Sequence, residues 1–434
     1  MATALSRFGR PELRAERQRR IALVGFGTVG GAVARLLHNR RDDHPLRLTH
    51  ICNRNVARKK ASWVEREVVW TDDLQHVLAS DADVVVELIG GLEPAHQLVR
   101  SALKSGKSVV TANKQLMAKF GRELQELAHE NGQYLGFGAC VAGGIPVLSA
   151  LQDGLVGDRL VQVRGILNGT CNYILSRIEQ AGCSFADALA EAQQAGFAEA
   201  DPTDDVDGHD AAAKLAILAR VGLKVDVATE RVMRRSIRNI AAIDFEYARE
   251  LGCTIRQIST AKLQDGAPYL VVEPSLVAMN SPLASVLGSQ NLVVSTGEFG
   301  GETTFGGHGA GGYPTAVAVV SDLLQAARNC GCTERSASRH VVASCEMTAD
   351  PEAPQYLRFV VRDRPGIIAQ IAGALSRHHI NLDAVLQKPG HDKSALPFVI
   401  TLERCKQSRV ESALQEIAQF DFLADAPLRM PIVQ

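Results

Sequence analysis

The stretch IALVGFGTVGGAVARLL, residues 21–37, determines how the chain starts its fold. An apolar run over residues 21–24 predicts a buried strand, and the turn GFGTVG (25–30) leads into a predicted helix. In this strand–turn–helix context the glycine spacing is typical of a dinucleotide-binding turn. Gly25 permits the tight turn, Gly27 lets a pyrophosphate approach the backbone, and Gly30 allows close helix–strand packing. A structural turn that binds no nucleotide is the alternative.

The end of the second predicted strand bears on which dinucleotide would bind. This strand covers residues 46–52, and Asn53 and Arg54 follow it. An acid at this place would bind a ribose 2′-hydroxyl. Its absence, together with the cations Arg58, Lys59 and Lys60, favours the 2′-phosphate of NADP(H), with NAD(H) as the second possibility. A solvated loop is the other interpretation of these cations.

Two further apolar runs, within residues 82–91 and 107–114, predict parallel strands buried on both faces. With the first two strands they indicate an α/β fold built on a Rossmann-like sheet. Lys114 follows the carboxyl end of the last of these strands, where open α/β sheets bind their ligands. We therefore treat Lys114 as a candidate site residue, and a solvated loop lysine is the alternative.

An acidic segment, GFAEADPTDDVDGHDAAAK (196–214), places six carboxylates within twelve residues. A solvated face is the ordinary interpretation of such a run. Here the acids lead into an apolar helix, AAAKLAILARVG (211–222), on which Asp210 and Lys214 share a face. A charged pair on a buried helix needs a polar partner or a ligand. A calcium loop is excluded, because Thr203 and Lys214 would stand where the first acid and the bidentate glutamate belong.

Composition limits the class of protein. A chain of 434 residues with 46% apolar residues predicts two or three domains with real cores, and a net charge of −1 argues against nucleic acid as a partner. The nine cysteines lack C-x-x-C pairs, so neither a zinc site nor a disulfide framework is indicated. A reducing, cytoplasmic location fits this cysteine pattern best. No apolar run is long enough to span a membrane.

The remaining segments complete the predicted organisation. Residues 1–19 are rich in arginine and are predicted to be an extension, because Glu12 and Glu16 argue against an organelle transit peptide. The glycine-rich segment 300–312 is interpreted as a crossing close to a cofactor rather than a flexible linker, since an apolar helix (316–324) follows it. A linker is predicted over 333–354. Strands and helices beyond it follow the order βαββαβ, which is ferredoxin-like.

Together these blocks resemble homoserine dehydrogenase in its monofunctional form with a C-terminal ACT domain. The blocks that carry the resemblance are GFGTVG (25–30), VVTANK (109–114), AGGIP (142–146), GILNGTCNYIL (165–175), the acidic segment, GAGGYPTA (309–316) and DRPGIIAQIAGAL (363–375). The resemblance implies a nucleotide domain over 20–150 with helix 312–330 packing back on it. It further implies an α+β substrate and dimerisation domain with a mixed sheet over 151–311, and an ACT domain over 355–434.

The family interconverts L-aspartate 4-semialdehyde and L-homoserine with NAD(P)(H), on the route to threonine, methionine and isoleucine. Carried over by position, Lys214 matches the proton donor and Lys114 a second lysine near the nicotinamide and the substrate. Glu199 and Asp210 match the acids that hold the substrate, and Asp205 a supporting acid. The matched cofactor positions are Gly25, Phe26, Gly27, Thr28, Val29, Gly30, Arg54, Lys114, Gly196 and Gly311.

The resemblance also implies a sodium ion, an effector and an oligomer. Main-chain carbonyls of Val141, Gly143 and Ile145 match the family's cation turn, although Gly138 stands where the family usually has glutamate. Gly366 and Ile367 would offer helix N–H groups to an amino-acid effector, with threonine suggested. A homodimer or homotetramer is expected, and an ACT domain used only for assembly is the alternative.

Elementary chemistry agrees with these roles. Hydride arriving at an aldehyde carbon builds negative charge on the oxygen, which a lysine can stabilise and protonate. Substrate and product carry an α-ammonium group, whose natural partner is a carboxylate. Two other functions stay open: a catalytically weakened amino-acid sensor that keeps the fold, with Gly138 as its support, and a dehydrogenase for a different amino-acid aldehyde.

Overall fold

The computed structural model describes residues 18–264, 266–329, 343–344, 347 and 350–433. Within these, the chain forms two compact units. The N-terminal unit comprises residues 18–113, 123–137 and 319–329, and the C-terminal unit comprises the other described residues. The predicted extension up to residue 17 and most of the predicted linker over 333–354 lie outside the described residues.

A parallel sheet forms the centre of the N-terminal unit, with strand order β3-β2-β1-β4-β5-β6. This order is the doubly wound Rossmann order, as predicted. The strands are β1 (Arg19–Val24), β2 (Leu46–Cys52), β3 (Val69–Thr71), β4 (Val84–Glu87), β5 (Ser108–Thr111) and β6 (Leu135–Gly136). The helices are α1 (Thr28–Asn39), α2 (Val56–Lys59), α3 (Leu74–Ala79), α4 (Ala95–Lys104) and α5 (Lys114–Glu130).

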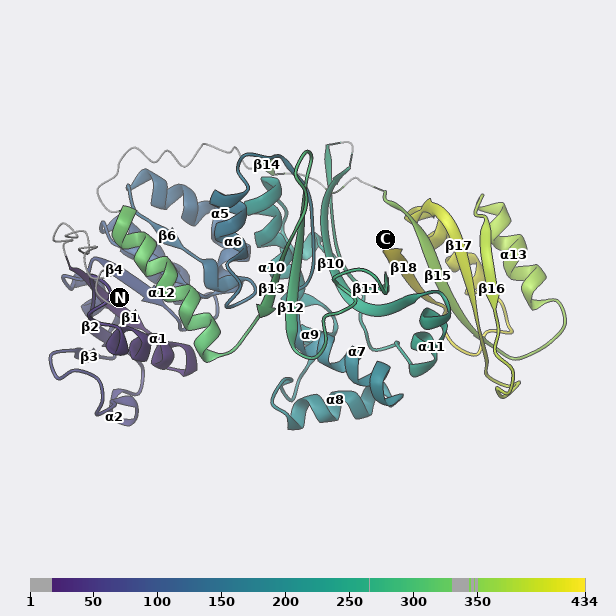
Figure 1. Cartoon of the computed structure of the whole chain (residues 1–434), viewed down its shortest axis with the longest axis horizontal. Helices are drawn as coiled ribbons and strands as arrows, with labels where there is room; N and C mark the ends of the chain where they lie inside the picture. Colours follow the sequence, from purple (N-terminus) through teal and green to yellow (C-terminus); the bar gives the residue numbers. More distant parts are fainter. Residues whose placement is uncertain (1–17, 265, 330–342, 345–346, 348–349, 434) are drawn as a thin grey trace, which may run out of the picture. The chain divides into compact units, whose positions relative to one another are not determined.

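A late helix, α12 (Gly312–Asn329), returns to this sheet with its second half (Figure 1). The Tyr134 hydroxyl donates to Gln325 Oε1 at 2.9 Å. At Gly136 in β6, an added Cβ would lie 2.7 Å from the Asp322 side chain, so glycine lets the helix approach the strand closely. The second half of α12 thus packs against β6, the last strand of the sheet, although the two are far apart in sequence.

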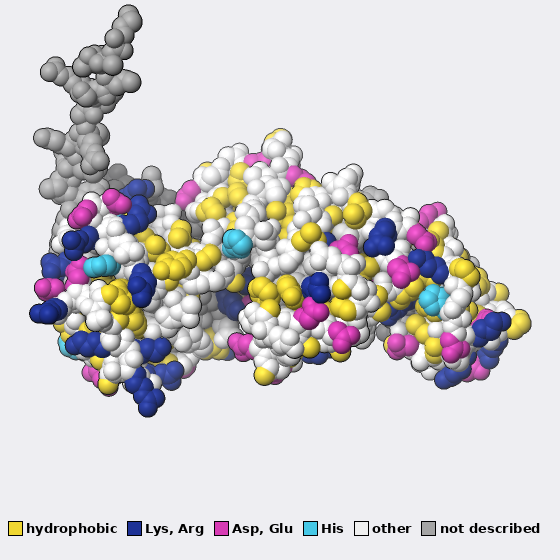
Figure 2. All heavy atoms as spheres, turned by 60° about the horizontal axis from the view of Figure 1, so that its bottom comes forward, with side chains coloured by type: hydrophobic (Ala, Val, Ile, Leu, Met, Phe, Trp, Pro, Cys, Tyr) yellow, Lys and Arg dark blue, Asp and Glu magenta, His cyan; other side chains and the backbone are white. Residues whose placement is uncertain are grey.

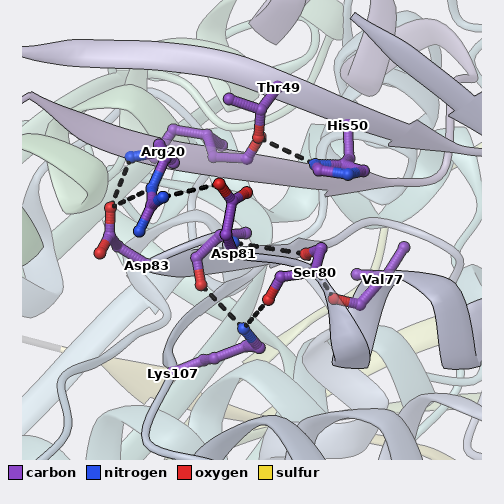
Figure 3. Close-up of polar contacts among 10 residues, drawn as sticks. Arg20, Thr49, His50, Val77, Ser80, Asp81, Asp83 and Lys107 are labelled. Carbon is purple, nitrogen blue, oxygen red and sulfur yellow. Dashed lines mark hydrogen bonds and ion pairs between the residues drawn. The ribbon is translucent and has the colours of Figure 1, made fainter.

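Polar groups tie the amino ends of the strands together, as Figure 3 shows. The Lys107 ammonium donates to the carbonyls of Ser80 at 2.6 Å and Ala82 at 2.9 Å. Arg20 donates from its backbone N–H to Asp83 at 2.8 Å and from its guanidinium to Asp81 at 2.6 Å. Burial lowers the pKa of Lys107. This network holds the amino ends of the strands together, whereas the glycine turn lies at the carboxyl end of β1.

A ten-stranded mixed sheet runs through the C-terminal unit, in the order β13-β12-β7-β10-β11-β18-β15-β17-β16 with β9 beside β11. It is mixed because β11 pairs parallel with β9 and β18, whereas its other pairs are antiparallel. The mixed sheet is therefore confirmed. Its strands before the ACT-like segment are β7 (Leu160–Ile166), β9 (Met233–Arg234), β10 (Cys253–Gln264), β11 (Ala267–Ala278), β12 (Gln290–Gly297) and β13 (Gly301–His308); β8 (Val225–Asp226) and β14 (Ala343–Ser344) pair separately.

The glycine-rich segment is mostly a β-strand, which excludes a flexible linker, and its approach to a cofactor stays a prediction. Residues 301–308 form the edge strand β13, paired along its length with β12. A Cβ at Gly306 would lie 2.8 Å from the Leu292 side chain, and one at Gly309 would lie 2.1 Å from Asn291. Close packing against β12 therefore explains these glycines, and the absence of apolar alternation hid the strand.

The helices of the C-terminal unit include one that is buried almost all round, as predicted. This helix, α10 (His209–Leu218), continues into a π-helical turn, η3 (Ala219–Leu223). The other helices before the ACT-like segment are η1 (Gly138–Cys140), α6 (Val147–Ser149), η2 (Ala150–Gly154), α7 (Gly169–Ala181), α8 (Phe185–Gln194), α9 (Thr203–Val206), η4 (Thr229–Arg231) and α11 (Ala242–Glu250).

The last segment has the predicted ferredoxin-like order βαββαβ. Its elements are β15 (Glu352–Val361), α13 (Ile367–Arg377), β16 (Leu382–Leu386), β17 (Leu396–Lys406), α14 (Gln407–Ile417) and β18 (Leu428–Val433). Apolar residues of both helices and of β15 and β17 form one core. Because β18 pairs with β11, this segment shares a continuous sheet with the rest of the unit.

The glycine turn yields a stability prediction with an internal control. A Cβ at Gly30 would lie 2.0 Å from the Gly25 carbonyl oxygen, whereas one at Gly31 would meet nothing within 4 Å. We expect Gly30→Ala to destabilise the protein by about 1–3 kcal/mol, because a well-packed contact is overfilled. Gly31→Ala should stabilise it by up to about 1 kcal/mol, because alanine is the better helix former. Thermal unfolding measures both, and equal effects would contradict the assignment.

Candidate active site

Asp210 and Lys214 form a buried ion pair on successive turns of α10. The Lys214 ammonium donates to Asp210 Oδ2 at 2.7 Å and to the Leu167 carbonyl at 2.9 Å. The Asp210 side chain is 8% exposed and that of Lys214 is 12% exposed. The sequence placed both on one helix face, and the structure adds the carbonyl from the end of β7 as a second acceptor for the lysine.

Lys114 joins the same carboxylate from a distant part of the chain. It is the first residue of α5, and its ammonium forms an ion pair with Asp210 Oδ1. Its side chain is 40% exposed, so this lysine faces solvent more than Lys214 does. The two carboxylate oxygens of Asp210 are thus divided between two ammonium groups.

Asn168 links Asp205 to the buried Asp210 and was not assigned a role from the sequence. Its side-chain NH2 donates to Asp205 Oδ1 at 2.6 Å and to Asp210 Oδ2 at 2.9 Å. Its oxygen caps α7 by accepting from the Cys171 N–H at 2.8 Å. The sequence signal was an asparagine directly before a helix, which predicts a cap. The cap fixes the amide, so its NH2 faces the acids.

The charges of the cluster shift its pKa values in opposite directions. Burial opposes ionisation of Asp210, but the attraction of Lys214 and Lys114 outweighs it and holds its pKa well below the ordinary value. Burial raises the pKa of Asp205, the Asn168 hydrogen bond opposes this, and the Asp210 charge adds to it. Burial likewise opposes the charge on Lys114, yet Asp210 raises the pKa of that lysine overall. Asp210 and Lys114 are therefore both charged at neutral pH.

The structure does not bring every predicted acid into this cluster. Glu199 is exposed, in the loop between α8 and α9, where its backbone carbonyl accepts from Gln193 Nε2 at 3.0 Å. Asp207 points elsewhere and binds Ser236 at 2.6 Å and Arg238 at 3.1 Å. The cluster proper consists of Asp205, Asp210, Lys114, Lys214 and Asn168, which we call the carboxylate–lysine cluster.

The glycine turn of the N-terminal unit has the geometry of a phosphate site. Gly25 has a φ of +103°, and a Cβ there would lie 2.6 Å from the Leu88 carbonyl oxygen. Gly27 caps α1 without any side-chain hydrogen bond, is exposed, and has open space where a Cβ would be. The first N–H groups of α1, from Thr28 and Val29, therefore stand at an open helix N-terminus that suits a pyrophosphate.

Asn53 stands at the end of β2, where an acid would bind a ribose hydroxyl. Its side-chain oxygen accepts from the Phe26 N–H at 3.3 Å and so supports the glycine turn. Arg54, Arg58, Lys59 and Lys60 beyond it are exposed. Figure 2 shows lysine and arginine side chains gathered over the N-terminal unit. This end of the strand thus offers cations and no acid to a ribose.

The remaining predicted cofactor and cation positions lie in left-handed turns of the C-terminal unit. Gly196 follows α8 with a φ of +76°, and Gly311 precedes α12 with a φ of +114°. In the turn that holds Val141 and Ile145, Ala142 and Gly143 have φ values of +56° and +47°. A Cβ at Gly143 would lie 2.6 Å from the Gly309 carbonyl oxygen. Residues in such strained backbone regions cluster at functional sites.

Side-chain metal sites and membrane spans are not found in the part of the chain that the structure describes. There, no group of three or more His, Cys, Asp or Glu side chains is placed to hold a metal ion. None of the described helices is both long and apolar enough to cross a membrane. The statement about metal ions concerns side chains only, so it does not apply to the main-chain carbonyls of the turn at Val141.

The predicted effector residues line a cavity at the start of α13. Gly366 is the N-cap, with a φ of +91° and no side-chain cap hydrogen bond, and Ile367 is the first helical residue. The cavity measures about 140 Å³. Its other lining residues include Arg364, Ile368, Gln387 and Phe398. It therefore combines helix N–H groups with an arginine and apolar walls, which suits a small amino acid.

Comparisons with known proteins agree along most of the chain. The family models described as homoserine dehydrogenase, NAD binding domain, as homoserine dehydrogenase, and as ACT domain match residues 25–137, 146–324 and 355–422. The homoserine dehydrogenase of Bacillus subtilis (strain 168) is 38% identical over 393 residues, which cover 88% of this chain and 91% of that protein.

Solved structures give the same result. A homoserine dehydrogenase from Thiobacillus denitrificans superposes with a TM-score of 0.89 at 34% identity, covering 96% of this chain and 98% of that one. A hyperthermophilic archaeal homoserine dehydrogenase in complex with NADPH has a TM-score of 0.62 at 27% identity, covering 71% and 97%. The chain therefore belongs to the homoserine dehydrogenase family of NAD(P)-dependent oxidoreductases.

Proposed function

We propose that the chain interconverts L-aspartate 4-semialdehyde and L-homoserine at the carboxylate–lysine cluster, with Lys214 as the proton donor in reduction. The observation that carries this proposal is the buried Asp210 carboxylate shared by Lys214 and Lys114. Bound NADPH supplies the hydride. The residues of the cluster bind the substrate and handle the charge that the hydride creates.

Lys214 is suited to meet the developing alkoxide. A lysine ammonium has three N–H donors. Among the described residues, Leu167 O and Asp210 Oδ2 accept two of them, which leaves one N–H for the substrate oxygen. Burial strengthens this interaction, because the surrounding dielectric is low. Lys214 therefore donates first a hydrogen bond and then a proton to the oxygen.

The carboxylates are suited to the α-ammonium group of the substrate. Asp205 lies at the partly exposed side of the cluster and is joined to Asp210 through Asn168. A charge-assisted hydrogen bond from an ammonium to these acids would orient the substrate. Glu199 is exposed in its loop, and its role in substrate binding is supported by sequence similarity alone.

The cofactor proposal is a preference for NADP(H) over NAD(H). It is supported by the exposed cations after β2 and by Asn53 in place of an acid. The similar archaeal enzyme binds NADPH. Arg54 would contact the 2′-phosphate, since it lies two residues beyond the end of β2, where that group lies in Rossmann folds.

We further propose a sodium site at the carbonyls of Val141, Gly143 and Ile145. The buried turn that carries them is held by a hydrogen bond from Ile145 N–H to the Ala142 carbonyl, 2.9 Å long. Because main-chain oxygens form this site, the replacement of the family glutamate by Gly138 leaves the ligands in place. Hard cations prefer such oxygen ligands.

Threonine is the proposed effector, bound at the cavity of Gly366 and Ile367. The helix N-terminus would receive its carboxylate, and the apolar wall its methyl group. A homo-oligomer is proposed as well. It is supported by β13, which among the described residues ends the sheet and pairs only with β12, so that its outer edge could pair with a second copy.

A connecting segment, residues 234–241, offers a route from this domain to the acids. On one side, Arg235 donates to Glu411 of α14 at 2.6 Å, and the Asn239 carbonyl accepts from Arg358 of β15 at 3.0 Å. On the other side, Ser236 donates to Asp207 at 2.6 Å. Since Asp207 directly follows α9, which carries Asp205, movement of the segment would shift the acid loop.

The proton-donor role is tested by Lys214→Met. We expect kcat for NADPH-dependent reduction of aspartate semialdehyde to fall by about 10²–10⁴-fold, the usual contribution of a general acid. Lys224→Met is the matched control, because Lys224 is also partly buried and donates to a carbonyl, that of Val221 at 2.6 Å. It should keep wild-type kcat.

Wild-type protein that binds threonine without turnover would instead indicate an amino-acid sensor, and a preference for a longer semialdehyde would indicate a different dehydrogenase.

The cofactor preference is tested by Arg54→Ala. We expect KM for NADPH to rise about tenfold or more, the loss of one charge-assisted hydrogen bond, while KM for NADH stays unchanged. Arg66→Ala, at another exposed arginine of the same unit, controls for net charge. Equal losses with both cofactors would remove the proposed contact with the 2′-phosphate.

The effector proposal is tested by filling its cavity with Ile368→Trp. We expect threonine binding, measured by calorimetry, to weaken at least about tenfold because the lining residue then occupies the ligand space. Basal kcat should be unchanged. Val385→Trp, at a comparably exposed apolar residue of β16, is the control. In Ser236→Ala we expect threonine to bind as before but to inhibit less, and unchanged inhibition would rule out the connecting segment as the route.

A further inference from the structure

Arg220 lies in the π-helical turn η3 and uses its whole guanidinium within the protein. It is 4% exposed. Nη1 donates to the Met117 carbonyl at 2.6 Å and Nη2 to the Ala118 carbonyl at 3.0 Å. Nε donates to Asp226 Oδ1 at 2.7 Å. The guanidinium therefore spans two segments of the chain that are more than a hundred residues apart in sequence.

The two carbonyls belong to the start of α5, the helix whose first residue is Lys114. They follow Lys114 by three and four residues, so they lie one turn along the same helix. On the other side, Arg220 continues directly from α10, the helix of Asp210 and Lys214. The two helices that supply the charged groups are thus joined twice, once by the ion pair to Asp210 and once by Arg220.

Gly121 makes room for this second joint. A Cβ at this position would lie 2.1 Å from Arg220 Nη1. Glycine inside a helix costs about 1 kcal/mol relative to alanine. Close approach of the guanidinium to the backbone of α5 explains why glycine stands here. The Arg220 side chain therefore occupies the space that a side chain at position 121 would need.

We propose that Arg220 is a positioning residue, which holds the first turns of α5 so that the Lys114 ammonium stays on the substrate side of Asp210. This inference rests on the proposed function, in which Lys114 acts beside the substrate. A lysine side chain is long and flexible, so its reach is set by where its backbone is held.

The anchor at Arg220 differs from the ion pair in one respect that matters for turnover. The Asp210 carboxylate is also one of the two acids proposed to bind the substrate ammonium, so substrate binding would compete with its hold on Lys114. Arg220 binds backbone carbonyls and Asp226, none of which is in the carboxylate–lysine cluster. It keeps α5 in place throughout the reaction. Misplacement of a catalytic group by about 1 Å can cost about 10²-fold in rate.

A double-mutant cycle with Lys114 tests the proposal. We expect Arg220→Met to lower kcat by about 10–100-fold in the wild-type background. In the Lys114→Met background the same substitution should change kcat less than twofold, because there is no longer an ammonium to position. Arg256→Met is the matched control: Arg256 is 1% exposed and is bound to Glu179 at 2.8 Å and to the Ala284 carbonyl at 3.0 Å. It should reduce thermal stability without lowering kcat of the folded enzyme.

Gly121→Ala is the second variant, should Arg220→Met not fold. It displaces the guanidinium but retains the charge, so it should lower kcat in the same direction and lose its effect in the Lys114→Met background. Multiplicative effects of Arg220→Met, or of Gly121→Ala, with Lys114→Met would overturn the positioning role alone. Wild-type kcat in Lys114→Met would instead remove the role of Lys114 in the proposed function, and the inference with it.

Discussion

The site depends on one buried carboxylate, that of Asp210. Burying an isolated charge is costly, and a charge stays buried only when it is paired and hydrogen-bonded. Asp210 meets this condition through Lys214, Lys114 and Asn168, and through its place in the first turn of α10, where the helix dipole favours an anion. Removal of any one partner takes away an ion pair or a hydrogen bond from the buried carboxylate. The partners therefore hold one another in place, and the lysines are oriented before any substrate arrives.

Three segments must meet for this pairing to exist: the start of α5, the cap of α7 and the start of α10. Each is a helix N-terminus, and each is fixed by the element before it. Lys114 follows β5 through Asn113, whose N–H and side chain are bound to Thr111 Oγ1 at 3.0 Å and the Gly91 carbonyl at 2.6 Å. Asn168 follows β7 directly. Two of the three helix starts are thus placed by the ends of strands, β5 and β7, whereas α10 follows the short helix α9.

Much of this could be predicted from the sequence wherever the cause is local. The strands β4 and β5 lie within the predicted runs 82–91 and 107–114, because a parallel strand buried on both faces is a nearly continuous apolar run. The pairing of Asp210 with Lys214 follows from helical spacing alone. Asn168 and Arg220 could not be assigned, since their partners lie tens to more than a hundred residues away. β13 was not predicted, because its glycines are needed for close packing against β12. A contact between two separate strands leaves no local sequence pattern.

In the proposed reaction, the balance of charge in the carboxylate–lysine cluster would favour an amino-acid aldehyde over a simple one. Asp210 is already neutralised by two lysines, whereas the pKa of Asp205 is raised by burial and by the nearby Asp210 charge. An incoming α-ammonium group would offset that repulsion. A bare aldehyde brings no such charge and leaves the repulsion in place. In the proposed function, recognition of the amino end of the substrate and proton transfer at its aldehyde end would therefore depend on the same carboxylates.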